Sequence, residues 1–280
     1  MGDVADLEQW LGSLDAAQLA ALLERRPDVR HGIAPRNLAH LAERLEHPES
    51  IANVLRRVPL PLLQAAEAVQ ALGERATLTE LSGLLQSDGA GHDAAVDAVV
   101  AQLSEHGLAW PGLGLRIQVP AGLGEVFPDP LGLSAPLRRL LPALTAAELR
   151  GVLLALGEHK PPTKRGDLED ALARCLSDPD RVRAVVAQAP AEVAEHLKSM
   201  AIRDTTDEGF YSGSFDYDAH EQRRRATRWA LDHGLLIGSR YGYDWRMPAE
   251  VGLALRGPNY RAPFNPRRPD PAASPIDPHT

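Results

Sequence analysis

Arginine is concentrated in the last quarter of the chain, on one predicted helix and the hairpin after it. The guanidinium group is a planar fork of hydrogen-bond donors that matches a phosphate or the edge of a guanine. An arginine beside a tyrosine at the hairpin tip could reach the adjacent groove or backbone. The candidate DNA-binding residues are therefore Arg223, Arg224, Arg225, Arg228, Arg240, Tyr241 and Arg246.

A similar helix earlier in the chain has no arginine at the equivalent positions, which are Val96, Asp97, Ala98 and Ala101. This type of helix therefore does not need arginine to fold. Arg224 and Arg228 are one turn apart and point away from the predicted apolar face, as in a helix that presents cations to phosphates or base edges. The alternative is a solvated face in which Glu221 and Arg225, four positions apart, form an ion pair.

The charge of the chain is unevenly distributed. Residues 220–268 hold ten arginines against four acidic residues, whereas residues 1–219 hold 20 basic and 32 acidic residues. The whole chain has a formal net charge of -8, which argues against a general nucleic-acid coat. A basic end on an acidic body nevertheless indicates a polyanionic partner for that end.

Catalytic motifs are missing from the sequence. There is no phosphate-binding G-x-x-x-x-G-K-[ST] loop, no G-x-S-x-G string and no H-E-x-x-H pair. The one cysteine, Cys175, lies between Leu172 and Leu176 on a predicted amphipathic helix, where a buried side chain is favoured over a nucleophile. We expect a protein that is not an enzyme and has no cofactor.

The string Asp216-Tyr-Asp218-Ala-His220-Glu221 has the residue types of a divalent metal site. Asp218 and Glu221 also have the spacing of a capping box at a helix start, where carboxylates favour the positive end of the helix. The capping interpretation is favoured, so no metal site is predicted.

The candidate residues are placed by one predicted unit, residues 218–255. Ala226, Trp229, Ala230 and His233 share one helix face, and Gly234 follows as a helix-ending glycine. Short strands at 235–237 and 245–247 flank the turn 238–242. A helix, a glycine and a hairpin in this order are typical of a recognition helix and its wing.

The same pattern occurs near residues 96–126, and the similarity extends upstream. Because several strings recur in one order at a nearly constant offset, we infer two copies of one unit of roughly 110 residues. His106 and His233 are equivalent, and each can contact the last carbonyls of its helix. The recurring strings begin at Leu14 and Leu144, Leu45 and Leu176, Glu105 and Asp232, and Val119 and Met247.

The predicted fold is mainly α, with two tandem copies of a helical pair plus a winged-helix module with a short β-hairpin wing. Hydrophobic residues make up 44% of the chain but aromatic residues only 5%, which favours helix over sheet. The predicted domains are 1–127 and 144–258, with a proline-containing linker at 128–143 and a proline-rich disordered tail at 259–280. No apolar run approaches 18 residues, so we expect a soluble cytoplasmic protein without a membrane partner.

Several strings resemble the helicase-associated domain proteins of actinobacteria, which carry a region similar to the N-terminal domain of XPB-type helicases. The strings are Leu7, Trp10, Leu11 and Leu14, residues 22–28, residues 41–45, and most specifically 247–257. The resemblance implies winged-helix modules of a protein presumed to bind DNA. It also implies a helicase-like region C-terminal to this segment, and it transfers no catalytic residue.

The leading hypothesis is therefore a non-enzymatic, helicase-associated protein that binds double-stranded DNA in transcription or DNA repair. The competing hypothesis is a protein-interaction scaffold in which the acidic winged helices contact a partner protein, and the acidic body favours it.

Overall fold

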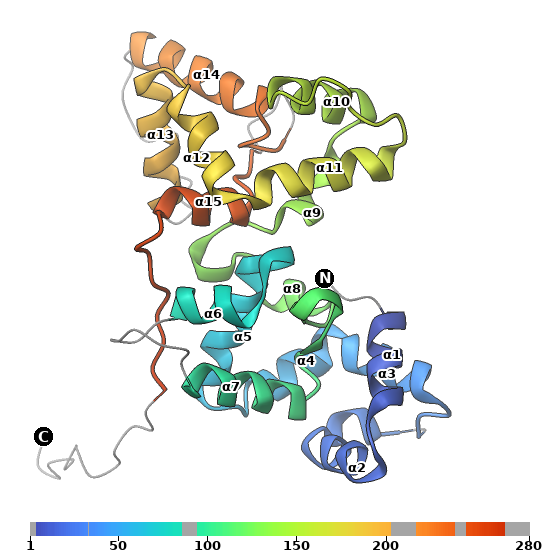
Figure 1. Ribbon diagram of the computed structural model, residues 1–280. Coiled ribbons are helices and arrows are strands. Elements are labelled where there is room, and N and C mark those ends of the chain that lie inside the picture. The colour runs from blue at the N-terminus through green and yellow to red at the C-terminus, as the bar shows by residue number, and fades with distance from the viewer. Residues whose placement is uncertain (1–3, 33, 86–93, 203–216, 239–244, 267–280) are drawn as a thin grey trace, which may run out of the picture.

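The computed structural model describes residues 4–32, 34–85, 94–202, 217–238 and 245–266, and it is mainly helical (Figure 1). Helices α1–α8 form the lower part of the view and α9–α15 the upper part. We call residues 4–126 the first unit and residues 137–256 the second unit. Five short 3-10 helices also occur, at Pro27–Arg30 (η1), Gly73–Arg75 (η2), Leu113–Leu115 (η3), Pro130–Gly132 (η4) and Leu141–Ala143 (η5).

The first unit begins with α1 (Val4–Ser13), α2 (Ala16–Arg25), α3 (Leu38–Glu46) and α4 (Pro48–Leu55). Helix α2 starts at a capping box in which Asp15 accepts from the backbone N–H of Gln18 and the Gln18 side chain accepts from the backbone N–H of Asp15. Helices α1, α2 and α3, with Val29 of η1, bury a leucine-rich cluster that also includes Trp110 from the later hairpin. The first three helices are therefore packed against the hairpin through Trp110.

The rest of the first unit contains α5 (Leu60–Leu72), α6 (Leu78–Leu85), α7 (Ala94–Glu105), β1 (Trp110–Pro111), β2 (Ile117–Gln118) and α8 (Leu123–Val126). Strands β1 and β2 pair antiparallel, and Arg116 also forms a bridge with Thr77. The backbone N–H of Ile117 donates to the carbonyl of Ala76 at 2.7 Å. The hairpin is thus joined to the segment between α5 and α6.

The second unit is also mainly helical. It contains α9 (Leu137–Leu140), α10 (Ala146–Ala155), α11 (Arg165–Ser177), α12 (Pro179–Ala187), α13 (Ala191–Ile202), α14 (Tyr217–Asp232) and α15 (Ala249–Arg256). Helix α10 also starts at a capping box, made by Thr145 and Glu148. The predicted loop or weak strand at 203–216 lies outside the described residues. Between α14 and α15, Ile237 and Arg246 form an antiparallel bridge in place of two longer strands.

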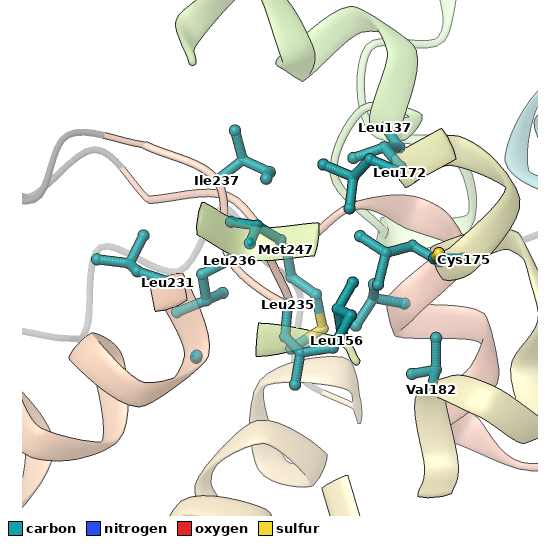
Figure 2. Close-up of a cluster of buried hydrophobic side chains, with 14 of the residues drawn as sticks. Leu137, Leu156, Leu172, Cys175, Val182, Leu231, Leu235, Leu236, Ile237 and Met247 are labelled. Atoms are coloured by element: carbon teal, nitrogen blue, oxygen red, sulfur yellow. The ribbon is translucent and has the colours of Figure 1, made fainter. Parts of the chain in front are cut away.

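The core of the second unit is built from leucine, valine and alanine of α9 to α15. Figure 2 shows Leu235, Leu236 and Ile237, which follow α14, packed among side chains of the preceding helices. Cys175 lies in this cluster and is buried. The segment after α14 is therefore anchored to the helical pair α10–α11 by apolar packing.

The predicted linker 128–143 is packed against both units. Leu133 and Leu137 are almost completely buried, one in the core of the first unit and the other in that of the second. Helix α15 lies at the same boundary (Figure 1), where Ala249 and Leu253 join the core of the first unit and Val251 joins that of the second. This contact between the units is continuous apolar packing.

Residues 259–266 belong to the predicted disordered tail, yet they run beside the first unit. The backbone N–H of Ala262 donates to the carbonyl of Leu84 at 2.8 Å, and that of Asn265 to the side chain of Gln64 at 2.9 Å. Tyr260 and Phe264 pack against the same core. The disordered-tail prediction is thus wrong for 259–266, while residues 267–280 lie outside the described part of the chain.

No helix among the described residues has the length and apolar character that crossing a membrane requires.

Candidate nucleic-acid interface

Helix α14 has one buried face and one charged face. Ala226, Ala230 and Leu231 are buried in the second core, where α14 contacts α13 and α10. The side chains of Arg224, Arg225 and Arg228 are all exposed, as the predicted periodicity requires. The side chain of Arg223 lies outside the described residues. Three of the four helical arginines therefore face solvent from a helix whose other face is packed into the core.

The end of α14 is fixed by a glycine and a histidine. Gly234 has φ +68°, and a Cβ atom there would lie 2.7 Å from Cγ1 of Val152 in α10. Glycine is therefore required both by the backbone conformation and by the closeness of α10. His233 stacks on Trp229 with ring centroids 3.9 Å apart, and its Nδ1 lies 2.8 Å from the Trp229 carbonyl. The predicted contact of His233 with the last turn is confirmed.

The predicted wing of the second unit begins beside the end of α14. The backbones of Ile237 and Arg246 exchange two hydrogen bonds of 2.8 Å, and the side chain of Arg246 is exposed. The candidates Arg240 and Tyr241 lie outside the described residues. The metal-like string 216–221 lies there too, because its first residue and the side chains of the others are not described. The described interface therefore consists of Arg224, Arg225, Arg228 and Arg246.

The equivalent helix of the first unit has a different surface. The exposed positions of α7 include Ala98, Ala101, Gln102 and Glu105, and none is cationic. At the tip of its hairpin, Leu115 is 87% exposed and has φ +63°. The exposed positions of α14 thus include three arginines, whereas those of α7 are mostly small and uncharged.

An internal ion-pair network shows how other arginines of this chain are used. Arg26 is fully buried; it binds Asp28 at 3.2 Å and donates to the carbonyl of His106, after α7, at 2.9 Å. Burial alone would raise the pKa of Asp28, but hydrogen bonds from Arg26 and Ser50 outweigh it and lower that pKa. Arg26 is therefore enclosed within the fold, whereas Arg224, Arg225 and Arg228 are exposed on α14.

The second unit also contains an arginine–carboxylate network, but its arginine, Arg181, comes from α12 and not from the end of the preceding helix, where Arg26 lies in the first unit. Arg181 binds Glu158 at 3.0 Å and donates to the Leu156 carbonyl at 3.0 Å. Burial raises the pKa of the nearby Cys175 thiol, whose Sγ lies 3.8 Å from the Glu158 carboxylate. A raised pKa keeps the thiol protonated, and the thiolate is the nucleophilic form. Among the described residues, no three of His, Cys, Asp and Glu gather in a way that could hold a metal ion.

Sequence reasoning missed a groove at the junction of the two units. It has a volume of about 340 Å³ and receives three arginines, Arg75, Arg183 and Arg261, from separate parts of the chain. No periodic or spaced motif joins these positions, so the sequence carried no signal for them.

No protein-family model matches this chain, and neither a curated protein nor a solved structure matches it.

Proposed function

We propose that this chain is a non-enzymatic protein that binds duplex DNA through α14 and the hairpin after it. The observation that carries the proposal is the exposed row of Arg224, Arg225 and Arg228 on a helix whose opposite face is buried. The major groove of DNA admits one α-helix, and arginine can contact both phosphates and guanine edges there. Arg246 extends the basic surface to the hairpin.

Tandem winged helices are the finer form of the fold that we propose. In the first unit, an extended residue, Thr77, separates α5 from α6, and a hairpin follows α7. Strand β2 pairs with β1, and the adjoining Arg116 bridges to Thr77, so three short extended segments lie side by side. This order of helices and extended segments supports a winged helix. In the second unit, α13, α14 and the Ile237–Arg246 bridge match α5, α7 and the hairpin, while the stretch that corresponds to α6, residues 203–216, lies outside the described residues.

Matching contacts at matching places support two related units. A Cβ atom on Gly107, after α7, would lie 3.5 Å from both Leu22 and Leu45, in α2 and α3. Gly234, after α14, is likewise next to Val152 and Leu176, in α10 and α11. In both units, a glycine with positive φ thus lies close to a preceding helical pair: Gly107 after α7 to α2 and α3, and Gly234 after α14 to α10 and α11.

A helicase-associated role in transcription or DNA repair is part of the proposal. It is supported by the resemblance of residues 247–257 and the N-terminal leucine-rich strings to helicase-associated domain proteins. Residues 249–256 of the most specific string form α15, which lies at the junction of the two units. In this proposal the chain contributes DNA contact and no chemistry of its own.

A protein-interaction scaffold is the second candidate function. One observation favours it for the first unit: Leu115 at the hairpin tip is 87% exposed, and the solvent face of α7 carries Ala98 and Ala101. Uncharged side chains of this kind offer phosphates no cation, so they suit a protein partner better. The two functions could be divided between the two units.

Duplex binding can be tested with Arg224→Ala combined with Arg228→Ala. Binding of a labelled duplex would be measured by fluorescence anisotropy over a series of salt concentrations. We expect weaker binding, and a log–log salt slope smaller by about 2, because each lost phosphate contact reduces counterion release by about one ion. The thermal midpoint should change little, since both side chains are exposed.

The matched control is Arg56→Ala combined with Arg57→Ala, which removes two exposed arginines at the end of α4. It changes the net charge by the same amount, so it measures the general electrostatic effect. If both double variants lose affinity equally, or if neither does, α14 is a solvated face and the scaffold function replaces DNA binding.

A further inference from the structure

We infer that the groove at the junction of the two units binds a nucleotide, with its phosphate on the arginines of the rim and its base against the leucines of the lining. This site is separate from α14, so it goes beyond the proposed duplex contact. The two sites can succeed or fail independently in experiments.

The groove has walls from both units. Its volume is about 340 Å³, and its lining comes from η2 and α6 on one side and from α12, α15 and the segment after α15 on the other. Figure 1 shows the segment after α15 passing beside α6. Leu72, Leu84 and Leu253 line it and are mostly buried in the core of the first unit. A groove of this size falls within the range of small-molecule sites, and its lining is about equally polar and apolar.

Three arginines reach this groove from separate segments: Arg75 from η2, Arg183 from α12 and Arg261 from the segment after α15. Arg75 pairs with Glu80 at 2.5 Å, and Arg183 pairs with Asp180 at 2.6 Å. Arg183 also donates from Nη1 to the Ala254 carbonyl at 3.2 Å, so Arg75 is the one of these two with more N–H donors left for a ligand, since one arginine carries five.

Arg261 differs from the other two arginines. Its Nη1 donates to the backbone carbonyls of Pro258 and Tyr260, at 2.8 and 2.9 Å. These bonds hold the side chain in place and leave its positive charge uncancelled by the oxygens it contacts. The guanidinium is therefore positioned and able to pair with an oxyanion in the groove.

The mixture of groups favours a nucleotide over a purely acidic ligand. Arginine forks bind phosphate in bidentate geometry, and the leucines of the lining suit a flat ring beside Tyr260, one face of which is covered by the Arg256 guanidinium 4.7 Å from its ring centroid. Glu80 also lines the groove, and its carboxylate can accept from an exocyclic amine or a sugar hydroxyl. A free nucleotide and one residue of a single strand share this chemistry.

The test uses calorimetric titration of the full chain with adenosine monophosphate, with a short single-stranded deoxyoligonucleotide and with an acidic peptide. Arg75→Ala combined with Arg261→Ala should weaken nucleotide binding by about tenfold or more, since hydrogen bonds to charged groups contribute at least that factor. Arg57→Ala outside the groove should leave it unchanged. If the oligonucleotide binds more tightly than the monophosphate, the natural ligand is one residue of a single strand. If the monophosphate binds more tightly, the natural ligand is a free nucleotide.

A second measurement does not depend on the folding of a variant. In methyl-labelled wild-type protein, adenosine monophosphate should shift the NMR signals of Leu72, Leu84 and Leu253. The Arg224→Ala, Arg228→Ala variant should keep nucleotide binding, and the Arg75→Ala, Arg261→Ala variant should keep duplex binding, which separates the two proposals. The nucleotide site would be overturned if the wild type did not bind adenosine monophosphate, or if the Arg75→Ala, Arg261→Ala variant bound it with unchanged affinity. It would also be overturned if this variant lost only its binding of the acidic peptide.

Discussion

Glu250 and Leu137 are joined across the packing of α15 and α9, where the buried carboxylate accepts the backbone N–H of Leu137 at 2.9 Å. Burial raises the pKa of Glu250 from 4.5 to about 7, although two backbone hydrogen bonds act in the opposite direction. Glu74 also raises this pKa and Arg75 lowers it. One titratable group is therefore enclosed at the junction of the two units.

The first prediction concerns pH. Because the folded state holds the Glu250 proton up to about pH 7 and the unfolded state loses it near pH 4.5, stability should fall as pH rises between these values. The free energy of unfolding that this group contributes, and that is lost once the pH exceeds about 7, is about 3 kcal/mol. In Glu250→Gln, the amide oxygen can still accept from Leu137, so this part of the pH dependence should vanish.

The measurement is the free energy of unfolding by urea at about pH 5 and about pH 8, taken as the difference between variant and wild type. Glu67→Gln is the matched control, since Glu67 also accepts a backbone N–H, from Leu131, at 2.8 Å but is only half-buried. The variant Glu250→Gln should gain stability relative to the wild type at the higher pH. A difference that does not change with pH would show that Glu250 is not the titrating group.

The second prediction concerns the two ion-pair networks. Arg26→Leu removes the guanidinium from Asp28 and leaves the His106 carbonyl without this donor. Breaking such a buried pair should cost about 3 kcal/mol. Adding Ser50→Arg places a cation where the second unit has Arg181, so it should recover part of that loss.

A double-mutant cycle gives the coupling between positions 26 and 50 from urea unfolding. Ser50→Arg alone should destabilise the protein, because it brings a second cation beside Arg26. A favourable coupling of about 1 kcal/mol or more would indicate that the networks are exchangeable. Additive effects would contradict the exchange and weaken the inference of two related units.

The third prediction concerns Gly234. An alanine there would have φ near +68° and a Cβ atom 2.7 Å from Val152, so Gly234→Ala should lower stability by about 2–3 kcal/mol. Gly151→Ala is the control, since this helical glycine has no heavy atom within 4 Å of an added Cβ. The control should be neutral or slightly stabilising in thermal unfolding. Equal midpoints for the two variants would show that α10 yields to the added methyl group.

Local features of the fold were predictable because they depend on nearby residues. The capping box at Thr145 and Glu148 and the helix-ending glycines Gly107 and Gly234 are short-range patterns, and the structure contains them. The exposed arginines of α14 followed from helical periodicity in the same way. Mainly α structure was therefore accessible from the sequence.

Long-range packing was not predictable by the same reasoning. Proline in 128–143 and 259–266 indicated a linker and a disordered tail, yet Leu133 and Ala262 are buried against the first unit. Their partners lie far away in the sequence, so no local pattern identifies them. Arg26 was indistinguishable from a surface arginine, although three separate elements enclose it. The junction groove was missed for the same reason.

The last prediction transfers the basic face to the first unit. Ala98 and Ala101 are exposed on α7 and are equivalent to Arg225 and Arg228. If a helix followed by a hairpin is the duplex-binding surface, Ala98→Arg combined with Ala101→Arg should increase duplex affinity by about tenfold at low salt and steepen its salt dependence. Fluorescence anisotropy with the same duplex would measure both quantities. Folding should be retained, because both positions face solvent.

The control for this gain compares two single variants that each add one positive charge, Asn53→Arg at an exposed position of α4 and Gln102→Arg at an exposed position of α7. Asn53→Arg lies outside the helix-and-hairpin surface and should add only the general electrostatic effect, whereas Gln102→Arg lies on α7 and should add more. This comparison separates position from net charge. Equal gains from Asn53→Arg and Gln102→Arg would show that charge alone governs affinity, and the helix-and-hairpin surface would then have no special role in duplex binding.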